Sequence, residues 1–469
     1  MDISQQIILT DDVMRSRLSW MVVGWLFLVA VLLWHRIKAR LPGSSGPLIY
    51  ASLFSLNHLF GGFIYCLPWY EPQHLYLVHG GWSVEMTYLG FIPSVQGFGA
   101  FVVGVLAMDR LLLRRAIRFA RAQKPRVIKY IPVLLSGLMF SVVLSPLLGS
   151  IPSVGALVSA GQRLATIGFI LAAWTAWKKG NNGGVIRWIG ASLIFPITST
   201  VMGGFIGFGT ASFIMVVVFS APFVKQRLLV VVSGLLLTYL GLSVWVTYSR
   251  DREEIRDVVW GNQGMDSRVS RVFDSFSDWE FFDITDNEHL ERIDMRLNQN
   301  HFVGRSVDYM SMGGEEFAKG ETIWFALISW IPRIVWPGKP TIGGSGSMVS
   351  DYTGMTMSEN SSFGVGQILE LYFNFGHKGV VVGMFLLGCL IRYLDIKSGI
   401  CLDRRNLVGF ILWVLPMLVM IQPNGSMAEV VSSCVSAGIL SVGLNVYFKF
   451  FESRRKGELL SETELNREP

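Results

Sequence analysis

The chain is poor in charge and in cysteine for its length. Of 469 residues only 16% are charged, whereas 51% are hydrophobic and the mean hydropathy is +0.46. A water-soluble chain of this length could not bury so much apolar surface in a core of its own. Its cysteines, Cys66, Cys389, Cys401 and Cys434, include no CxxC pair, so neither a disulfide framework nor a metal site is expected. These scarcities indicate a membrane protein.

Long apolar runs are frequent, and each predicts a membrane-spanning helix. A span needs about 20 mostly apolar residues to cross a hydrocarbon core of about 30 Å. Such runs occur at 18–34, 47–67, 87–108, 130–149, 154–177, 186–203, 205–223, 228–248, 378–391 with its preceding turns, 406–422 and 430–450. We therefore predict an all-α polytopic membrane protein with about eleven transmembrane helices. The first run lacks a basic start and a cleavage site, so it is expected to be retained.

Basic residues are missing from every second loop between these runs. The loops around 71–85, 149–154, 203–207 and 422–429 contain no lysine or arginine, whereas the alternate loops are basic. Cytoplasmic loops carry an excess of lysine and arginine, so this alternation places the N-terminus outside and the C-terminus inside. Arg15 and Arg17, just before the first run, oppose this orientation, which depends on the larger set. The same clusters account for the net charge of +6 without a nucleic-acid partner.

The alternation also divides the chain. Residues 1–248 hold the first eight predicted spans, 249–366 form one large outward (periplasmic) loop, 367–450 hold the last three spans, and 451–469 form a cytoplasmic tail. Within the loop, the run TIWFALISWIPRIVW at 322–336 is apolar but too short to span. It predicts an interfacial or re-entrant helix.

Two cations are framed by prolines in the sequence IPRIVWPGKP at 331–340. Proline fixes its own φ and restricts the residue before it. Arg333 is therefore expected to be pre-organised for a multidentate contact with phosphate oxygens, with Lys339 adding a point charge. The alternative, equally supported by physics alone, is that both cations only anchor the helix at the membrane surface.

The sequence IPRIVWPGKP, followed by SENSS at 358–362 and ELYFNFGHKGVVVGMFLLG at 370–388, resembles the Wzy-type oligosaccharide repeat unit polymerases. The likeness is sharpest over 304–392, and the rest of the chain matches in general plan. The resemblance implies a GT-C-like glycosyltransferase of the bacterial inner membrane, without metal or cofactor, whose active site faces the periplasm. Its substrates would be repeat units carried on undecaprenyl pyrophosphate, for O-antigen or exopolysaccharide biosynthesis. Membrane lipids, a chain-length regulator and a flippase are the other expected partners.

The resemblance also assigns residues. Family members hold their anionic carriers with outward-facing arginines, which implies Arg333 by motif position and Arg305, in VGRSVDY, as a second. Many members carry a further arginine in the turn that here reads GGFIGFGT at 203–210, so Arg250 or Arg252 is expected to replace it.

Further residues are candidates for proton transfer and for sugar binding. Glu370, His301 and Glu359 could accept a proton from the acceptor hydroxyl. Trp336, Tyr372 and Asn374 could bind the glycan, although an aromatic membrane belt explains the aromatic residues equally well. For Glu370 the alternative is a helix partner for Lys378 or for an arginine, and for His301 it is an ordinary exposed histidine.

Other functions fit parts of the pattern. An O-antigen ligase would share the topology and the lipid donor but use another acceptor. A lipid-linked oligosaccharide flippase or other transporter would usually show paired repeats and more charge within its spans. A scaffold subunit of an export complex would have no active site, so its function would not depend on Arg333.

Overall fold

The computed structural model describes residues 10–38, 42–122, 129–149, 151, 154–224, 226–331, 335–340, 345–357 and 364–465. Within these ranges the chain is helical and contains no strand, which confirms the predicted all-α class. The first half contains α1 (Asp11–Lys38), α2 (Gly46–Ile64), α3 (Leu75–His79), α4 (Val84–Ala122), α5 (Tyr130–Met139), α6 (Ser145–Leu148), α7 (Val154–Lys178), α8 (Asn182–Ala191), α9 (Ile194–Gly203), α10 (Ile206–Ser220) and α11 (Arg227–Arg250). The second half contains α12 (Arg252–Trp260), α13 (Met265–Ser277), α14 (Asn287–Leu297), α15 (Gln299–Ser311), α16 (Glu321–Ser329), α17 (Ser345–Thr353), α18 (Gln367–Asp403), α19 (Leu407–Met420) and α20 (Met427–Leu465).

Among the described residues, nine helical segments are long and apolar enough to cross a membrane. They are α1, α2, α4, α7, α8 together with α9, α10, α11, α18 and α20. The other two predicted runs form shorter apolar helices, Tyr130–Leu144 and Leu407–Met420. Each predicted run is therefore helical, and the chain has the helices of a multi-pass membrane protein.

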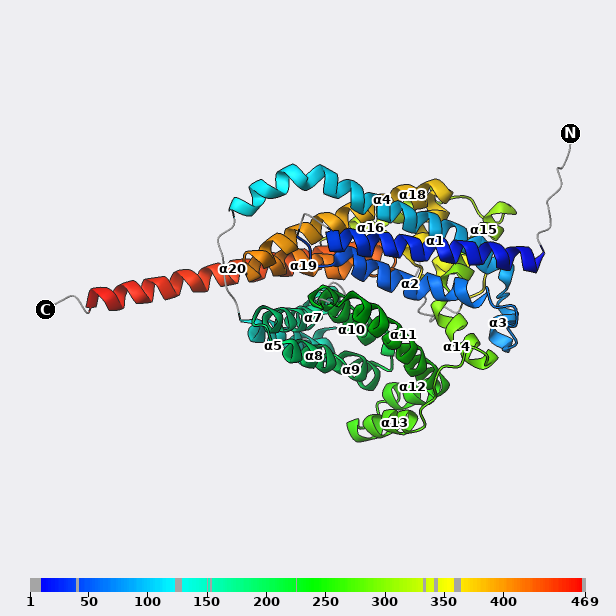
Figure 1. Cartoon of the computed structure of the whole chain (residues 1–469), viewed down its shortest axis with the longest axis horizontal. Coiled ribbons are helices and arrows are strands. Elements are labelled where there is room, and N and C mark those ends of the chain that lie inside the picture. Colours follow the sequence, from blue (N-terminus) through cyan, green and yellow to red (C-terminus); the bar gives the residue numbers. More distant parts are fainter. Residues whose placement is uncertain are drawn as a thin grey trace.

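Helices α1, α2, α4, α18 and α20 run roughly along the longest axis of the molecule (Figure 1). Helices α1, α2, α4 and α18 pack against one another, while α5, α7, α8, α9 and α10 form a second group. The short helices α3, α12, α13 and α14 lie toward the end where α1 begins, and the last part of α20 extends from the opposite end. Of the short helices of the segment 249–366, α14 lies toward the end where α1 begins, whereas α16 lies beside α18, nearer the middle of the long helices.

Helix α4 packs closely against both α15 and α18 because small residues stand at the contacts. A Cβ on Gly304 of α15 would collide with the carbonyl oxygen of Met86, and one on Gly90 would collide with that of Asn300. Small residues at helix crossings let backbones approach to this degree. The contact fixes α15, the helix that carries His301 and Arg305.

Polar side chains also fasten the start of α15 to α2. The Nδ2 of Asn300 donates to the carbonyl oxygen of His58 at 2.7 Å, and its Oδ1 lies 2.9 Å from Nδ1 of the same histidine. Both side chains are fully buried. Because buried polar groups are costly unless paired, this contact favours one position of α15 relative to α2.

The charges buried in α18 are paired at its other end. Arg392 donates through Nε to Asp109 of α4 at 2.7 Å and also pairs with Asp395. Asp395 in turn accepts hydrogen bonds from the backbone nitrogens of Ser44, at 2.6 Å, and Gly46, at 2.9 Å. These contacts tie the turn before α2 to α4 and α18 by neutralising charge inside the helical layer.

Helix α18 is longer than the predicted run and is broken inside. It begins at Gln367, and its helical dihedral angles are interrupted at Phe375 and Gly376. Gly376 has φ 63° and ψ −155°, a conformation that residues with a Cβ rarely adopt. Two of the predicted site residues, Glu370 and Asn374, therefore lie on a short helical segment before the break.

The described residues of the predicted interfacial run form α16 and the turn that follows it. Trp324 and Leu327 of α16 are exposed, whereas Ala326 and Ile328 are buried. α16 packs against α20. An exposed apolar face on a helix too short to span agrees with an interfacial position.

Candidate functional site

His301 lies at the start of α15 and is completely buried. Its ring stacks on Trp82 with a centroid distance of 3.7 Å and an interplanar angle of 12°. Within the described part of the chain, neither ring nitrogen forms a hydrogen bond of normal geometry. Burial and the charge of Arg305 lower the pKa of His301 to about 3, and the Gly80 backbone offsets only part of this shift. The ring is therefore neutral and, in this conformation, out of reach of a substrate.

Arg305, one helical turn further along α15, has no acidic partner among the described residues. Its guanidinium lies beside the turn between α3 and α4, where Nη1 would be 3.7 Å from a Cβ on Gly81. Its Nε is buried without a hydrogen-bond partner in the described ranges. A half-buried guanidinium with unused donors is suited to an anionic ligand.

A second group of arginines comes from α12 and α14. Burial lowers the pKa of Arg296, and the charges of Arg252 and Arg256 lower it further. Burial and then Arg252 likewise lower the pKa of Arg256, against smaller opposing effects of Tyr248 and Glu253. In the described ranges no acid lies within ion-pair distance of Arg252, Arg256 or Arg296, so this group carries uncompensated positive charge.

Tyr76 of helix α3 lies close to the second group of arginines and contacts Trp82, which lies near Arg305. The charges of Arg296 and Arg252 reach the Tyr76 hydroxyl, whose pKa is nevertheless raised by burial. The Tyr76 ring contacts Trp82 at 5.4 Å, and Trp82 stacks on His301 beside Arg305. We call Arg252, Arg256, Arg296 and Arg305 the α3 arginine set.

Arg256 lies against the turn between α9 and α10. This is the turn in which many members of the resembled polymerase family carry an arginine that this sequence lacks. Its Nε donates to the carbonyl oxygen of Gly204 at 3.5 Å, and its guanidinium carbon lies 4.5 Å from the centre of the Phe205 ring. Arg256 was not among the predicted residues. Its position four residues after Arg252, on the same face of a helix, was the signal that could have identified it.

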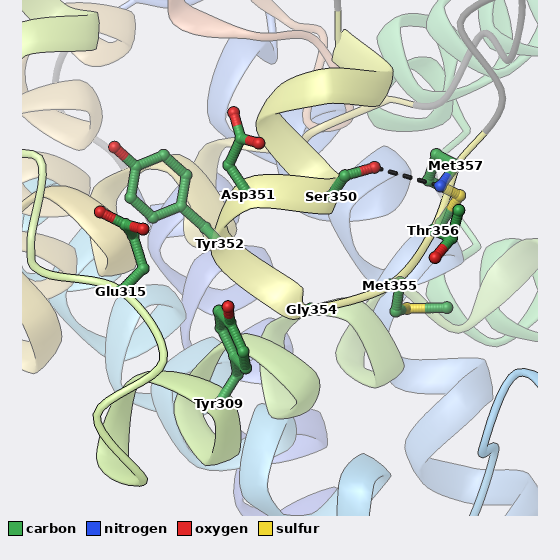
Figure 2. Close-up of a pocket in the computed structure, with 9 residues that line it drawn as sticks. All are labelled: Tyr309, Glu315, Ser350, Asp351, Tyr352, Gly354, Met355, Thr356 and Met357. Carbon is green, nitrogen blue, oxygen red and sulfur yellow. Dashed lines mark hydrogen bonds between the residues drawn. The ribbon is translucent and has the colours of Figure 1, made fainter.

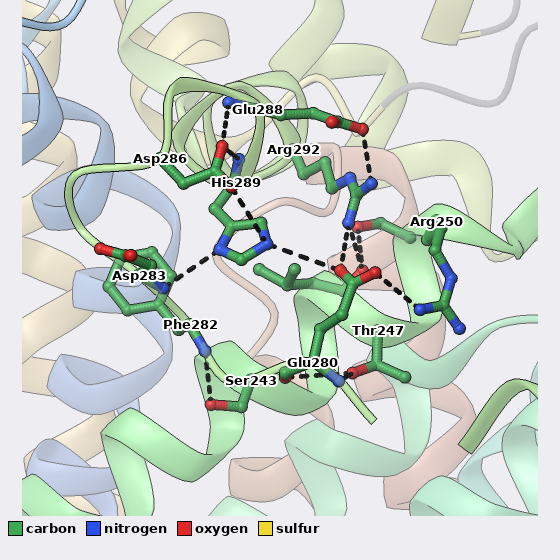
Figure 3. A network of polar contacts seen from close by, with 12 residues as sticks. Ser243, Thr247, Arg250, Glu280, Phe282, Asp283, Asp286, Glu288, His289 and Arg292 are labelled. Atoms are coloured by element: carbon green, nitrogen blue, oxygen red, sulfur yellow. Dashed lines mark hydrogen bonds and ion pairs between the residues drawn. The ribbon is translucent and has the colours of Figure 1, made fainter. Parts of the chain in front are cut away.

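Arg250, the other predicted replacement, is neutralised (Figure 3). It pairs with Asp251 at 3.0 Å and with Glu280 at 2.6 Å. Glu280 also accepts from Arg292 at 2.8 Å, which joins the end of α11 to α14. These pairs indicate that Arg250 holds the loop together and has little free charge for a ligand.

Helix α14, which carries Arg296, is held by a buried carboxylate. Asp294 accepts hydrogen bonds from the hydroxyls of Tyr65, at 2.7 Å, and Tyr70, at 2.6 Å. Burial raises the pKa of Asp294 to about 6, although these hydrogen bonds act in the opposite direction. Because the tyrosines follow α2, the contact fixes α14 to the end of a long helix.

Glu370 and Asn374 are buried in contacts between helices. A carboxylate oxygen of Glu370 accepts from the backbone nitrogen of Met427, at the start of α20, at 2.6 Å. Asn374 donates to Thr322 at 2.8 Å and accepts from the Gly320 nitrogen at 3.0 Å, at the start of α16. These two predicted site residues therefore brace α16 and α20 and are shielded from a ligand in this conformation.

The remaining predicted residues are dispersed. Lys339 donates to the carbonyl oxygens of Ser329, at 2.8 Å, and Ile331, at 2.9 Å, and so closes the end of α16. Trp336 is partly exposed beside it, and Tyr372 is buried with its ring against Phe317. Arg333 and Glu359 lie outside the described residues.

A hollow of about 630 Å³ opens between the end of α15 and α17 (Figure 2). It is lined by Tyr309, Glu315, Ser350, Asp351, Tyr352, Gly354, Met355, Thr356 and Met357. None of these residues is among the predicted site residues. Its volume falls in the range of small-molecule sites.

Comparisons with known proteins give a family without an assigned role. No curated protein and no solved structure matches the chain. A match to one family extends over residues 92–402, from inside α4 to the end of α18, and includes the α3 arginine set and the hollow. The chain therefore belongs to the family described as a domain of unknown function, DUF8712.

Proposed function

We propose that this protein is a membrane glycosyltransferase that polymerises oligosaccharide repeat units linked to undecaprenyl pyrophosphate. In this proposal it crosses the bacterial inner membrane eleven times, and the segment 249–366 faces the periplasm. The growing glycan leaves its carrier when the bond between the anomeric carbon and pyrophosphate breaks. A hydroxyl oxygen of the next lipid-linked unit forms the new bond and loses its proton to a base.

The observation that carries the proposal is the α3 arginine set. Its guanidinium groups, which come from α12, α14 and α15, have no acidic partner within the described residues. A departing pyrophosphate develops negative charge, and fixed cations stabilise that charge without reorganisation. Arg252 begins α12 just after the end of α11, and Arg256 lies one helical turn further, so both would lie near where the phosphates of a lipid carrier meet the membrane surface.

The base is the least defined part of this proposal. His301 and Glu370 are buried, with exposed fractions of 0% and 1%, and neither lines the hollow between α15 and α17. Glu359 and the two carboxylates of the hollow, Glu315 and Asp351, are therefore the groups to test as proton acceptors.

The test is the set of lipid-linked products in cells that lack this protein. Loss of a polymerase leaves single repeat units on the carrier at the periplasmic face. Loss of a flippase traps them on the inner leaflet, and loss of a ligase leaves long polymer on the carrier. Either of the last two patterns, or an unchanged pattern, would overturn the proposal.

Variants then test the arginines. Arg296→Ala and Arg305→Ala should each lower polymer yield by about 10²-fold, as expected when a stabilising donor is removed from a developing charge. Arg305→Lys should recover little, because lysine lacks the planar fork. The control is Arg268→Ala in α13, which removes an arginine whose hydrogen bonds to described residues go to Gln263 and Asn262. Equal yields for all variants and wild type would exclude a role for the set.

A further inference from the structure

The hollow between α15 and α17 has two aromatic walls held in fixed positions. The Tyr352 ring stacks on Phe373 of α18, with centroids 4.2 Å apart and an interplanar angle of 7°. The Tyr309 ring lies against Gly314 and Gly354, where an added Cβ would collide with it. Gly354 has φ +65°, so its conformation also favours glycine. Flat rings fixed in this way can pack on the apolar faces of sugar rings.

The hollow has acidic walls and no compensating cation. No lysine, arginine or histidine of the described residues pairs with Glu315 or Asp351, both of which are exposed. Burial raises the pKa of Tyr352, and the charges of Glu315, Glu321 and Asp351 add to that shift. In the described ranges no group of three histidine, cysteine or acidic side chains is placed to hold a metal ion. These carboxylates are therefore free to accept hydrogen bonds from hydroxyl groups, and they repel anions.

The hollow and Arg305 share one helix, α15. Arg305 and Tyr309 are four residues apart on α15, so they project from the same face, about 6 Å apart along the helix axis. A glycan attached to a pyrophosphate at Arg305 could therefore extend along α15 toward Tyr309. The positive charge of Arg305 favours the pyrophosphate end of such a substrate, and the acidic hollow favours an uncharged part of its glycan.

We propose that the hollow between α15 and α17 binds non-anionic sugar residues of the repeat unit, packed on Tyr309 and Tyr352 and hydrogen-bonded to Glu315 and Asp351. This inference rests on the proposed function and adds to it a substrate class. Uronic acids and other anionic sugars are excluded from this part of the glycan, whereas neutral and amino sugars are accepted.

The test uses the glycan of the organism itself. Repeat units are released by mild acid from the lipid-linked intermediate that accumulates in the deletion strain, and their binding to the purified full-length protein in nanodiscs is measured. Tyr309→Leu, and the pair Glu315→Gln with Asp351→Asn, should each raise the Kd at least about tenfold. Glu316→Gln should bind as wild type, because Glu316 is exposed, pairs with Lys319 and does not line the hollow. Circular dichroism checks that each variant keeps its helices.

Two further measurements test where the glycan binds and whether the hollow discriminates against anionic sugars. Arg296→Ala should leave this Kd unchanged, because the released glycan has no pyrophosphate. Oxidation of primary hydroxyls to carboxylates should weaken binding to wild type. Unchanged affinity in the hollow variants, equal loss in Arg296→Ala, no binding by wild type, or tighter binding of the oxidised glycan would each overturn the inference. Failure to accumulate the intermediate at all would instead overturn the proposed function.

Discussion

Single residues in the segment 249–366, which includes the end of α11, differ in how their charge is used. On α14, Arg292 pairs with Glu280 at 2.8 Å and with Glu288 at 2.5 Å, whereas Arg296, one turn later, has no acid within ion-pair distance in the described ranges. The same contrast separates the ion-paired Arg250, at the end of α11, from Arg252 and Arg256 of α12. An arginine of this segment can thus hold two helices together through ion pairs or can carry a charge that no ion pair neutralises. Only the acidic partners within reach distinguish the two cases.

His301 gives a prediction about pH. Its pKa is about 3 in the folded protein and about 6.5 when exposed, so below pH 6.5 the unfolded chain binds a proton that the folded chain does not. Stability from this residue is therefore present above pH 6.5 and falls as the pH decreases toward 3. Between pH 7 and pH 5 the loss should be about 2 kcal/mol.

The measurement compares wild type with His301→Phe, which retains a ring against Trp82 but cannot titrate. Free energies of unfolding from SDS titrations in mixed micelles, at pH 7 and pH 5, give the two slopes. The raised pKa of Asp294 changes stability in the opposite direction over this range, so the difference between the slopes isolates His301. Parallel slopes would show that the imidazole is protonated or rearranged in the folded state.

At the scale of elements, the position of α15 decides where Arg305 and Tyr309 lie. Gly304→Ala should destabilise the protein by about 1–3 kcal/mol, because the new methyl group meets the backbone of α4. The same change should lower polymer yield by displacing Arg305. Gly207→Ala in α10 is the matched control, since a Cβ there has nothing within 4 Å. We expect Gly304→Ala to lower both the free energy of unfolding and the polymer yield, and Gly207→Ala to leave both close to wild type. A stable, active Gly304→Ala protein would contradict the close contact between α15 and α4.

The elements that the sequence predicted well are the long ones. Length and hydropathy predict the nine described helices that are long and apolar enough to span, because a span must be apolar over about 20 residues wherever it lies in the chain. The other two of the eleven predicted runs form shorter apolar helices. The contact of Gly90 with Gly304 could not be predicted, because these residues are distant in sequence and glycine alone does not reveal its partner. The same limit applies to the site: Arg305 was recognisable from its motif, but the burial of Glu370 depends on α16 and α20 packing around it. The uncompensated charge of Arg256 and Arg296 likewise appears only when the acids of neighbouring helices are placed.

At the scale of the whole molecule, orientation connects the helices to the proposed chemistry. Lys179 follows α7 and belongs to the predicted cytoplasmic loops, whereas Ser267 lies on α13, one of the short helices of the segment 249–366. Both side chains are exposed. If the segment 249–366 faces the periplasm, the two positions lie on opposite sides of the membrane.

Cysteine labelling tests this orientation directly. In intact spheroplasts a membrane-impermeant maleimide should label Ser267→Cys and leave Lys179→Cys unlabelled until the membrane is permeabilised. The parent chain, with its native cysteines, gives the background, and polymer yield shows that each variant is assembled correctly. Labelling of Lys179→Cys alone would place the α3 arginine set and the hollow in the cytoplasm, where they could not meet a substrate at the periplasmic face. The electrostatic argument for pyrophosphate would then apply to a different carrier, because the physics of the arginines does not depend on the side of the membrane but the identity of their substrate does.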